Sequence, residues 1–188
     1  MGGGTDMPAD QDILEYLRSH YFGKYRGTVS DNQDPTARGR LKVSVPTVLG
    51  TLEVWAMPCV PYAGDKIGFY SLPPNGSGVW VEFEAGDPSY AVWTGCFWAD
   101  EELPELSGPD VKFWKTSSHT VRLDDAADEL LIQNSAASKT TYSSDVTTES
   151  GGATHTVGSE GVTSEVGANK VEVTPASVSI NNGALEVA

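Results

Sequence analysis

Bulky side chains are concentrated in the first two thirds of this 188-residue chain, and this limits how the chain can fold. All five Trp, all five Phe and six of the seven Tyr lie at or before Trp114, and only Tyr142 lies beyond it. With 39% hydrophobic residues the chain can bury one modest core, which must lie in this first part. The last third must be stabilised in another way.

The stretch 38–46 has the clearest local pattern. Three apolar residues alternate with polar ones, which is the period of a half-buried strand, and Pro46 ends the run by removing a backbone donor. Short strands at near-regular spacing, with no helix-length segment between them, predict a five-stranded OB-type barrel over residues 21–98. The other predicted strands, bounded by turns rich in Gly, Pro, Asn and Asp, are 25–29, 53–57, 79–84 and 90–97, and residues 66–71 are either a short strand or an irregular segment.

Two other segments flank the predicted barrel. Residues 1–20 begin with a Gly-rich lead and continue as a short helix from residue 6, with Ile13, Leu14 and Leu17 on one apolar stripe. Residues 99–115 are acidic and contain two prolines, which predicts a linker, and strand alternation restarts at its end.

Residues 116–188 begin with a predicted β-hairpin and then consist mainly of Thr, Ser, Val, Gly and Glu. The pattern V-G-x-x-x-V at 157–162 recurs at 166–171. Composition alone would allow disorder, but periodic β-branched residues favour strands. One such chain has no core of its own, whereas several chains wound together would cover each other's valines. The expected core residues of this intertwined needle are Val157, Val162, Val166, Val171, Val173, Val178 and Ile180.

The net charge of −14 disfavours nucleic acids and anionic membranes as partners. OB barrels bind single strands through aromatic side chains above a basic groove. The only basic cluster here is Arg38, Arg40 and Lys42, and the later barrel strands are acidic. We therefore expect no nucleic-acid partner and interpret the tryptophans as packing within the barrel and between chains. The tryptophans concerned are Trp55, Trp80, Trp93 and Trp98.

No residue pattern predicts a catalytic site, a cofactor site or a metal site. Glu82 and Glu84 lie about 6.5 Å apart on one predicted strand, as in some glycosidases, but their alternation with apolar residues favours a solvated strand face. His155 lacks a nearby His or Cys, so a metal site there would need three copies around a threefold axis, and ordinary exposure is the simpler interpretation. The acidic residues of the hairpin turn lack the order of a calcium loop; they are Asp124, Asp125, Asp128 and Glu129.

The two cysteines, Cys59 and Cys96, lie among apolar residues and are predicted to be buried free thiols, with a disulfide only in an oxidising compartment. The sequence shows neither a secretory leader nor a run of 18 apolar residues. We therefore expect that the chain neither enters the secretory route nor spans a membrane by itself.

Short motifs follow one another in order from residue 27 to residue 125. They are Gly27-x-Val29, Asp34-Pro35, Gly39-Arg40-Leu41-Lys42-Val43-x-Val45-Pro46, Trp55, Pro58, Tyr62-Ala63-Gly64, Pro73-x-x-Gly76, Val79-x-Val81-x-Phe83-x-x-Gly86-Asp87-Pro88, Gly95 and Ser118-His119-Thr120-Val121-x-Leu123-Asp124-Asp125. This series resembles the phage baseplate assembly protein V family, which includes the OB domains of VgrG proteins and of contractile-tail spikes.

The resemblance implies a non-enzymatic homotrimer, with OB barrels forming a collar and C-terminal strands winding into a trimeric β-helix needle. Such a spike sits under the hub ring of a contractile injection machine and is driven through the target envelope when the sheath contracts. The resemblance further implies assembly in the cytoplasm and function in the baseplate of a phage tail or injection-system particle. We expect Arg38, Arg40 and Lys42 to face the hub.

Several departures from the family pattern are visible. No hub domain precedes the barrel and no lysozyme-like domain follows it, which is similar to the arrangement in which hub and spike are separate chains. The His-x-His iron-binding end of some members is missing, so the needle either ends bluntly or carries a PAAR-type tip protein or cargo. The alternative hypothesis is a monomeric OB module that binds oligosaccharide or nucleic acid and has a disordered tail. The expected tip residues are Ala184, Leu185, Glu186, Val187 and Ala188.

Overall fold

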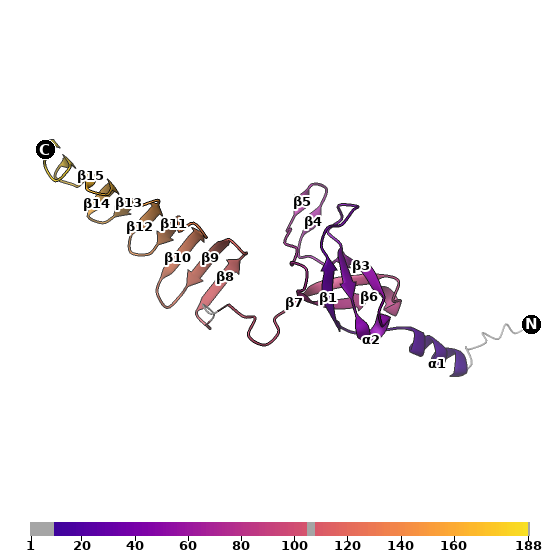
Figure 1. Cartoon of the computed structure of the whole chain (residues 1–188). Helices are drawn as coiled ribbons and strands as arrows, with labels where there is room; N and C mark the ends of the chain where they lie inside the picture. Colours follow the sequence, from indigo (N-terminus) through magenta and orange to yellow (C-terminus); the bar gives the residue numbers. More distant parts are fainter. Residues whose placement is uncertain (1–9, 105–107, 188) are drawn as a thin grey trace, which may run out of the picture. The chain divides into compact units, whose positions relative to one another are not determined.

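The computed structural model of the chain describes residues 10–104 and 108–187. The chain divides after Leu103 into two compact units, each of which is described by itself. Within the described residues the fold is mainly β, as the sequence predicts (Figure 1).

Helix α1 (Asp10–Ser19) confirms the short predicted helix, although its predicted first residues 6–9 lie outside the described residues. Ile13, Leu14 and Leu17 are all exposed on it. Arg18 lies in the last turn, where a cation is favoured by the helix dipole.

Five strands of the first unit close into a barrel in the order β1-β2-β3-β7-β6, which is consistent with the predicted OB fold. The pairs are antiparallel except β3 with β7, which is parallel. The strands are β1 (Tyr25–Asp31), β2 (Leu41–Ser44), β3 (Glu53–Pro58), β6 (Gly78–Phe83) and β7 (Ala91–Phe97).

The barrel core follows from the alternation seen in the sequence. Leu41, Val43 and Val45 are fully buried, whereas Lys42 and Ser44 between them are only half-buried. A helical turn, α2 (Pro46–Leu49), begins where the strand was expected to end, because the fixed φ of proline suits a first helical turn. The full set of buried apolar residues is Val29, Leu41, Val43, Val45, Ala56, Val79, Val81, Phe83, Ala91 and Trp93.

Residues 66–71 form a short strand followed by an irregular segment, as the two alternatives allow. Within the described residues, β5 (Ile67–Gly68) and β4 (Ala63–Gly64) pair only with each other and contribute nothing to the barrel. Ile67 is exposed, so the apolar residues of this segment do not serve the core. One difference from the predicted strands is that β6 ends one residue early, and Glu84 begins the 3₁₀ turn η1 (Glu84–Gly86).

Burial of the two cysteines is also wrong, because both thiols are exposed. Cys59 follows the last residue of β3, beyond the alternating strand. On β7, Ala91 and Trp93 are buried, whereas Cys96 lies near the end of the strand, one residue before Phe97. Apolar sequence neighbours were therefore a poor guide to the side on which each sulfur lies.

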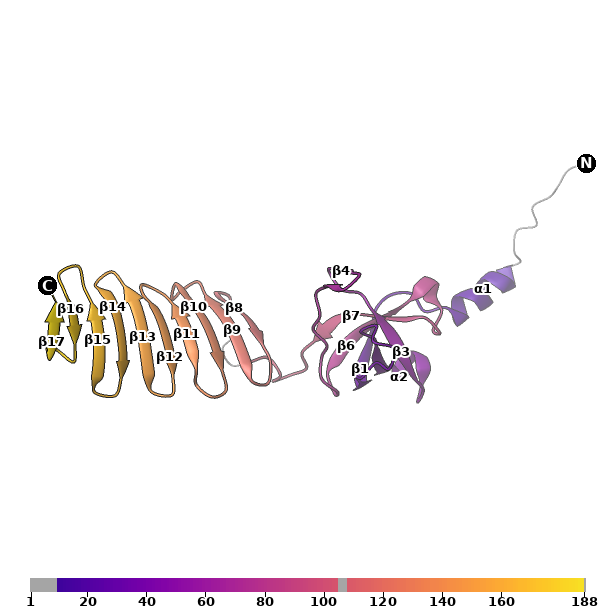
Figure 2. The same cartoon turned by 90° about the horizontal axis from the view of Figure 1, so that it is seen from above.

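The second unit is one antiparallel sheet in which each of ten strands pairs with the strand that follows it in the chain (Figure 2). The predicted hairpin is present as its second and third strands. The strands are β8 (Val111–Lys115), β9 (His119–Asp124), β10 (Glu129–Asn134), β11 (Lys139–Tyr142), β12 (Val146–Ser150), β13 (Ala153–Gly158), β14 (Gly161–Val166), β15 (Asn169–Val173), β16 (Val178–Ile180) and β17 (Leu185–Val187).

The expectation that these strands wind together with other chains stays a prediction. Among residues 108–187 each strand pairs with its neighbours in the chain sequence. The reason is local: two-residue turns, such as Gly151-Gly152, return the chain directly onto the strand before. The first part of the predicted linker therefore remains a connection, whereas its last residues form β8.

Gly161 fixes the turn between β13 and β14. Its φ is +142°, and an added Cβ would lie 2.0 Å from the carbonyl oxygen of Val173. We expect Gly161→Ala to lower the free energy of unfolding of this sheet by about 2–3 kcal/mol. The measurement is urea unfolding followed by far-UV circular dichroism.

The control for this prediction is Gly151→Ala, in a turn where an added Cβ meets no atom within 4 Å. Its φ of +58° is strained for alanine, so the expected loss is about 1 kcal/mol. Equal losses for the two variants would contradict the close approach at Gly161.

Candidate functional site

The register of the C-terminal sheet aligns apolar residues across strands β9–β17. Each member lies directly opposite the next, so they form one continuous line on one face, which we call the apolar row. The row consists of Leu123, Leu130, Tyr142, Val146, Val157, Val162, Val173, Val178 and Val187.

A second line, which we call the mixed row, runs beside the apolar row on the same face, two residues along each strand. It spans all ten strands and contains both apolar and polar side chains. The row consists of Trp114, Val121, Ile132, Thr140, Thr148, His155, Ser164, Val171, Ile180 and Leu185.

These rows bring together six of the seven residues that the sequence predicted as a needle core. The seventh, Val166, flanks the mixed row on the same face and pairs with Ala153 and Asn169. The side chains are uncovered in the single chain: Val157 is 43% exposed and Val171 is 44% exposed. The sheet therefore has a long apolar face with no covering layer among the described residues.

The opposite face of the sheet is polar and charged on β11–β16, whereas on β8–β10 it also carries Val111, Phe113 and Leu131. Lys139 pairs with Glu149 at 3.0 Å, and Lys170 pairs with Glu172 at 2.8 Å. A line of opposed residues on this face is Thr147, Thr156, Thr163, Glu172 and Ser179. The two faces thus differ in the way that separates a solvated surface from a buried one.

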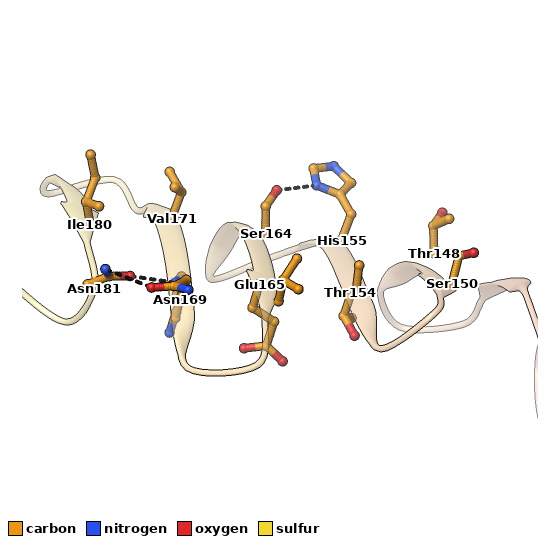
Figure 3. Close-up of a pocket in the computed structure, with 13 residues that line it drawn as sticks. Thr148, Ser150, Thr154, His155, Ser164, Glu165, Asn169, Val171, Ile180 and Asn181 are labelled. Atoms are coloured by element: carbon orange, nitrogen blue, oxygen red, sulfur yellow. Dashed lines mark hydrogen bonds between the residues drawn. The ribbon is translucent and has the colours of Figure 1, made fainter.

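His155 lies in the middle of the mixed row. Its Nδ1 atom is 2.7 Å from Oγ of Ser164 on the neighbouring strand. Figure 3 shows His155, Ser164, Val171 and Ile180 rising from the same side of the sheet, while Glu165 points to the other. Among the described residues, no group of three or more His, Cys, Asp or Glu side chains is arranged to hold a metal ion.

The predicted tip corresponds to the last strand of the sheet. Ala184 precedes β17, and Leu185 and Val187 of that strand are exposed. Ala188 and the side chain of Glu186 lie outside the described residues.

The basic cluster of the barrel is largely paired within the chain. The Arg40 guanidinium contacts Asp34 Oδ1 at 2.8 Å, and Lys42 contacts Glu53 at 3.2 Å. Arg38 has no ion-pair partner among the described residues. That this basic cluster faces the hub stays a prediction. Arg38 is the member whose charge is not paired within the described residues.

Asp34 is a structural residue that the sequence interpretation missed. Its carboxylate is 3% exposed and accepts hydrogen bonds from the backbone N–H groups of Thr36, Arg38 and Arg40 and from the Arg40 side chain. The Arg40 guanidinium and these N–H donors hold the pKa of Asp34 well below its usual value. The available signal was Asp34-Pro35-Thr36, a typical turn sequence in which the Asp side chain accepts from the backbone.

The tryptophans do not form one stacking surface. Trp93 is in the core, and its Nε1 donates to the carbonyl oxygen of Gly39 at 3.3 Å. Arg26 lies over the rings of both Trp80 and Phe97. The other two tryptophans have different surroundings. Arg40 lies over the ring of Trp55, and Trp98 is exposed.

The other chemical candidates have ordinary surroundings. Glu82 pairs with Lys24 at 2.8 Å, and Glu84 is no longer on the same strand. In the acidic turn, Arg122 pairs with both Asp124 and Glu129. None of the helices within the described residues has the length and apolar character needed to cross a membrane.

The described residues thus define a mainly β protein with an OB-type barrel and a separate meander sheet. Residues 25–98 match the family described as the Type VI secretion system/phage-baseplate injector OB domain, which confirms the resemblance to baseplate assembly protein V and VgrG; the barrel belongs to this family. The match supports a structural role in the baseplate of a phage tail or Type VI secretion system. No curated protein matches the chain.

Proposed function

We propose that this chain is the central spike of a contractile phage tail or related injection system, and that three copies assemble through their apolar faces. The observation that carries the proposal is the apolar row, which continues without a charge through nine strands. In this arrangement the charged faces point to solvent and the apolar faces line a common axis. The spike acts mechanically and not as an enzyme.

The size of the face agrees with such an assembly. Ten strands at about 4.8 Å spacing give a sheet about 43 Å long, and a width of about 15 Å gives roughly 650 Å² of flat area per chain. A standard protein–protein interface buries roughly 800 Å² of accessible surface per partner. This value includes the uneven surface of the side chains and is therefore larger than the flat area of the same patch. Three twisted sheets placed face to face form a trimeric β-helix needle, with winding supplied by the right-handed twist of the sheets.

The direction of the ladder explains how the needle carries force. The strands run across the sheet, so its long direction is the hydrogen-bonding direction. Compression along that direction pushes neighbouring backbones against each other at a spacing of about 4.8 Å, where van der Waals repulsion resists it. Sheath contraction is thereby transmitted to the small end at β17, which pierces the envelope or holds a PAAR-type tip protein or cargo.

The remaining parts of the proposal concern assembly. The barrels of the three copies form the collar under the hub ring, and Arg38 is the basic residue available to an acidic hub surface. The chains assemble in the cytoplasm and act in the baseplate of the particle. The alternative, a monomeric OB binding module with a disordered tail, is not favoured because residues 108–187 contain a continuous sheet.

The mass of the full chain in solution tests this proposal. We expect a particle of three 20.0 kDa chains by light scattering, which persists on an SDS gel without heating. Boiling should convert it to a 20.0 kDa band. A monomer at every concentration, with residues 140–188 removed readily by protease, contradicts the proposal.

A further inference from the structure

The mixed row changes character in the middle of the sheet. It is apolar on β8–β10 and again on β15–β17, but it is polar on the four strands between. We call these four residues the polar band; they are Thr140, Thr148, His155 and Ser164. Beside them, the apolar row remains apolar on every strand, so any layer that covers the face must cover the band as well.

The polar band is only partly satisfied within the chain. His155 Nδ1 bonds to Ser164 Oγ at 2.7 Å, and the hydroxyls of Thr140 and Thr148 are 3.3 Å apart. An imidazole has a second ring nitrogen, and each hydroxyl has one donor and two acceptor sites, so bonding capacity remains on each residue. Figure 3 shows the His155 ring and Ser164 on the same side of the sheet as Val171 and Ile180, and both residues are exposed.

The surroundings of His155 on this face are uncharged. On β12 its neighbours are Val146, Thr148 and Ser150, and on its own strand they are Ala153 and Val157. On β14 they are Val162, Ser164 and Val166. Glu149 and Glu165 belong to the opposite face. The band therefore offers neutral hydrogen bonds, which suits a partner with the same uncharged, half-polar pattern.

We propose that the polar band fixes the register in which copies of this chain pack their apolar faces together. This inference rests on the proposed trimer and specifies its geometry. When the polar bands of two copies lie against each other, the polar atoms that lack a partner within one chain form hydrogen bonds with the other copy. A single buried polar residue sets register in coiled coils by the same physics.

A shifted assembly loses these bonds. Neighbouring strands run in opposite directions. The smallest shift between two copies that again aligns strands of the same direction is therefore two strands, or roughly 10 Å. It would set His155 against Val171 and Ser164 against Ile180 of the other copy. A buried polar group without a partner is much more unfavourable than a made bond is favourable, so the shifted register is disfavoured.

The valine part of the apolar row cannot provide this discrimination. On its last six strands it contains valine at every position, so a shift by two strands there replaces valine with valine. The six residues are Val146, Val157, Val162, Val173, Val178 and Val187. Association strength and register thus come from different rows of the same face.

Cross-linking of two reporter chains tests the register. In a Cys59→Ser, Cys96→Ser background, one chain carries Val146→Cys on β12 and the other, with a longer tag, carries Val162→Cys on β14. The two are unfolded, refolded together and oxidised, and the tag masses distinguish same-site links from mixed links. In register, same-site links exceed mixed links at least tenfold, because the two reporter positions are two strands apart.

His155→Val in both chains should keep the trimer and reduce this ratio at least fivefold, since the face becomes more uniformly apolar. His155→Asn keeps a hydrogen-bonding side chain and should retain most of the preference. Thr156→Val, on the opposite face of the same strand, is the matched control and should leave the ratio unchanged.

The outcomes separate this inference from the function on which it rests. A trimer with equal same-site and mixed links, or with the same ratio in His155→Val, overturns the register role and leaves the spike intact. A chain that stays monomeric overturns the proposed function and the register role together.

Discussion

Replacing Val157 and Val173 together with Asp should convert the assembled chain into monomers while the barrel stays folded. Both residues belong to the apolar row, on β13 and β15. Three copies would bring six carboxylates into the covered interior, where each uncompensated charge costs several kcal/mol. We expect the mass by light scattering to fall to one third and the SDS-resistant band to disappear.

The matched control places the same charge on the other face. Thr156→Asp and Thr163→Asp lie on β13 and β14, opposite each other on the polar face. Because that face already carries Glu149 and Glu172, two more carboxylates there should leave the trimer intact. If the Val157, Val173 variant remains trimeric, or the control dissociates equally, the apolar row is not the interface.

The second large effect is expected at Asp34 in the barrel. Asp34→Asn removes the charge opposite Arg40 and turns an amide NH₂ toward a site surrounded by donors. An Asn side chain has one acceptor oxygen, so several of these donors lose their partner. We expect the midpoint of thermal unfolding to fall by about 5 °C or more, measured by tryptophan fluorescence. Asp65→Asn, at an exposed carboxylate between β4 and β5, should change it little.

The same substitution should change the pH dependence of stability. In the unfolded chain an Asp carboxyl has a pKa of about 3.9, and in the folded barrel the pKa of Asp34 is much lower. Below about pH 4 the unfolded chain therefore binds a proton that the folded chain does not, and the free energy of unfolding decreases as the pH is lowered. Above about pH 5 the Asp34 carboxylate makes its full contribution to the free energy of unfolding.

Urea midpoints between pH 7 and pH 2.5 measure this dependence. The parent chain should lose stability steeply below pH 4, and Asp34→Asn should show a shallower slope because one carboxylate no longer contributes. Parallel slopes for the two chains would show that Asp34 is not a source of acid sensitivity.

The barrel was predictable from the sequence because its core follows strict alternation. Leu41, Val43 and Val45 are buried as their spacing predicts. The sequence left the segment around Ile67 open between a strand and an irregular segment, and its apolar residues are exposed in a short hairpin outside the barrel. The local pattern of apolar residues in the sequence does not show which of them fit inside a closed barrel.

The sequence of the C-terminal sheet predicted strands and the valines that share one face, but it did not predict the strand pairing. Valine spacing identified the residues of the apolar face, whereas the partner of each strand depends on turn geometry. Gly151, Gly161 and Gly167 have positive φ at three of these turns and were the available signal for a meander. The role of Asp34 was hidden because its partner Arg40 looked like part of a surface cluster.

The meander also determines how the C-terminal sheet can change in length. Val146, Val162 and Val178 occupy the same row at intervals of 16 residues, each interval supplying two strands. Since every strand contacts only its sequence neighbours, adding or removing one interval would alter the reach of the sheet by roughly 10 Å and leave the remaining pairs unchanged. Duplication or deletion can therefore adjust the length of this sheet in fixed steps without changing the barrel, and in the proposed spike the sheet length is the length of the needle.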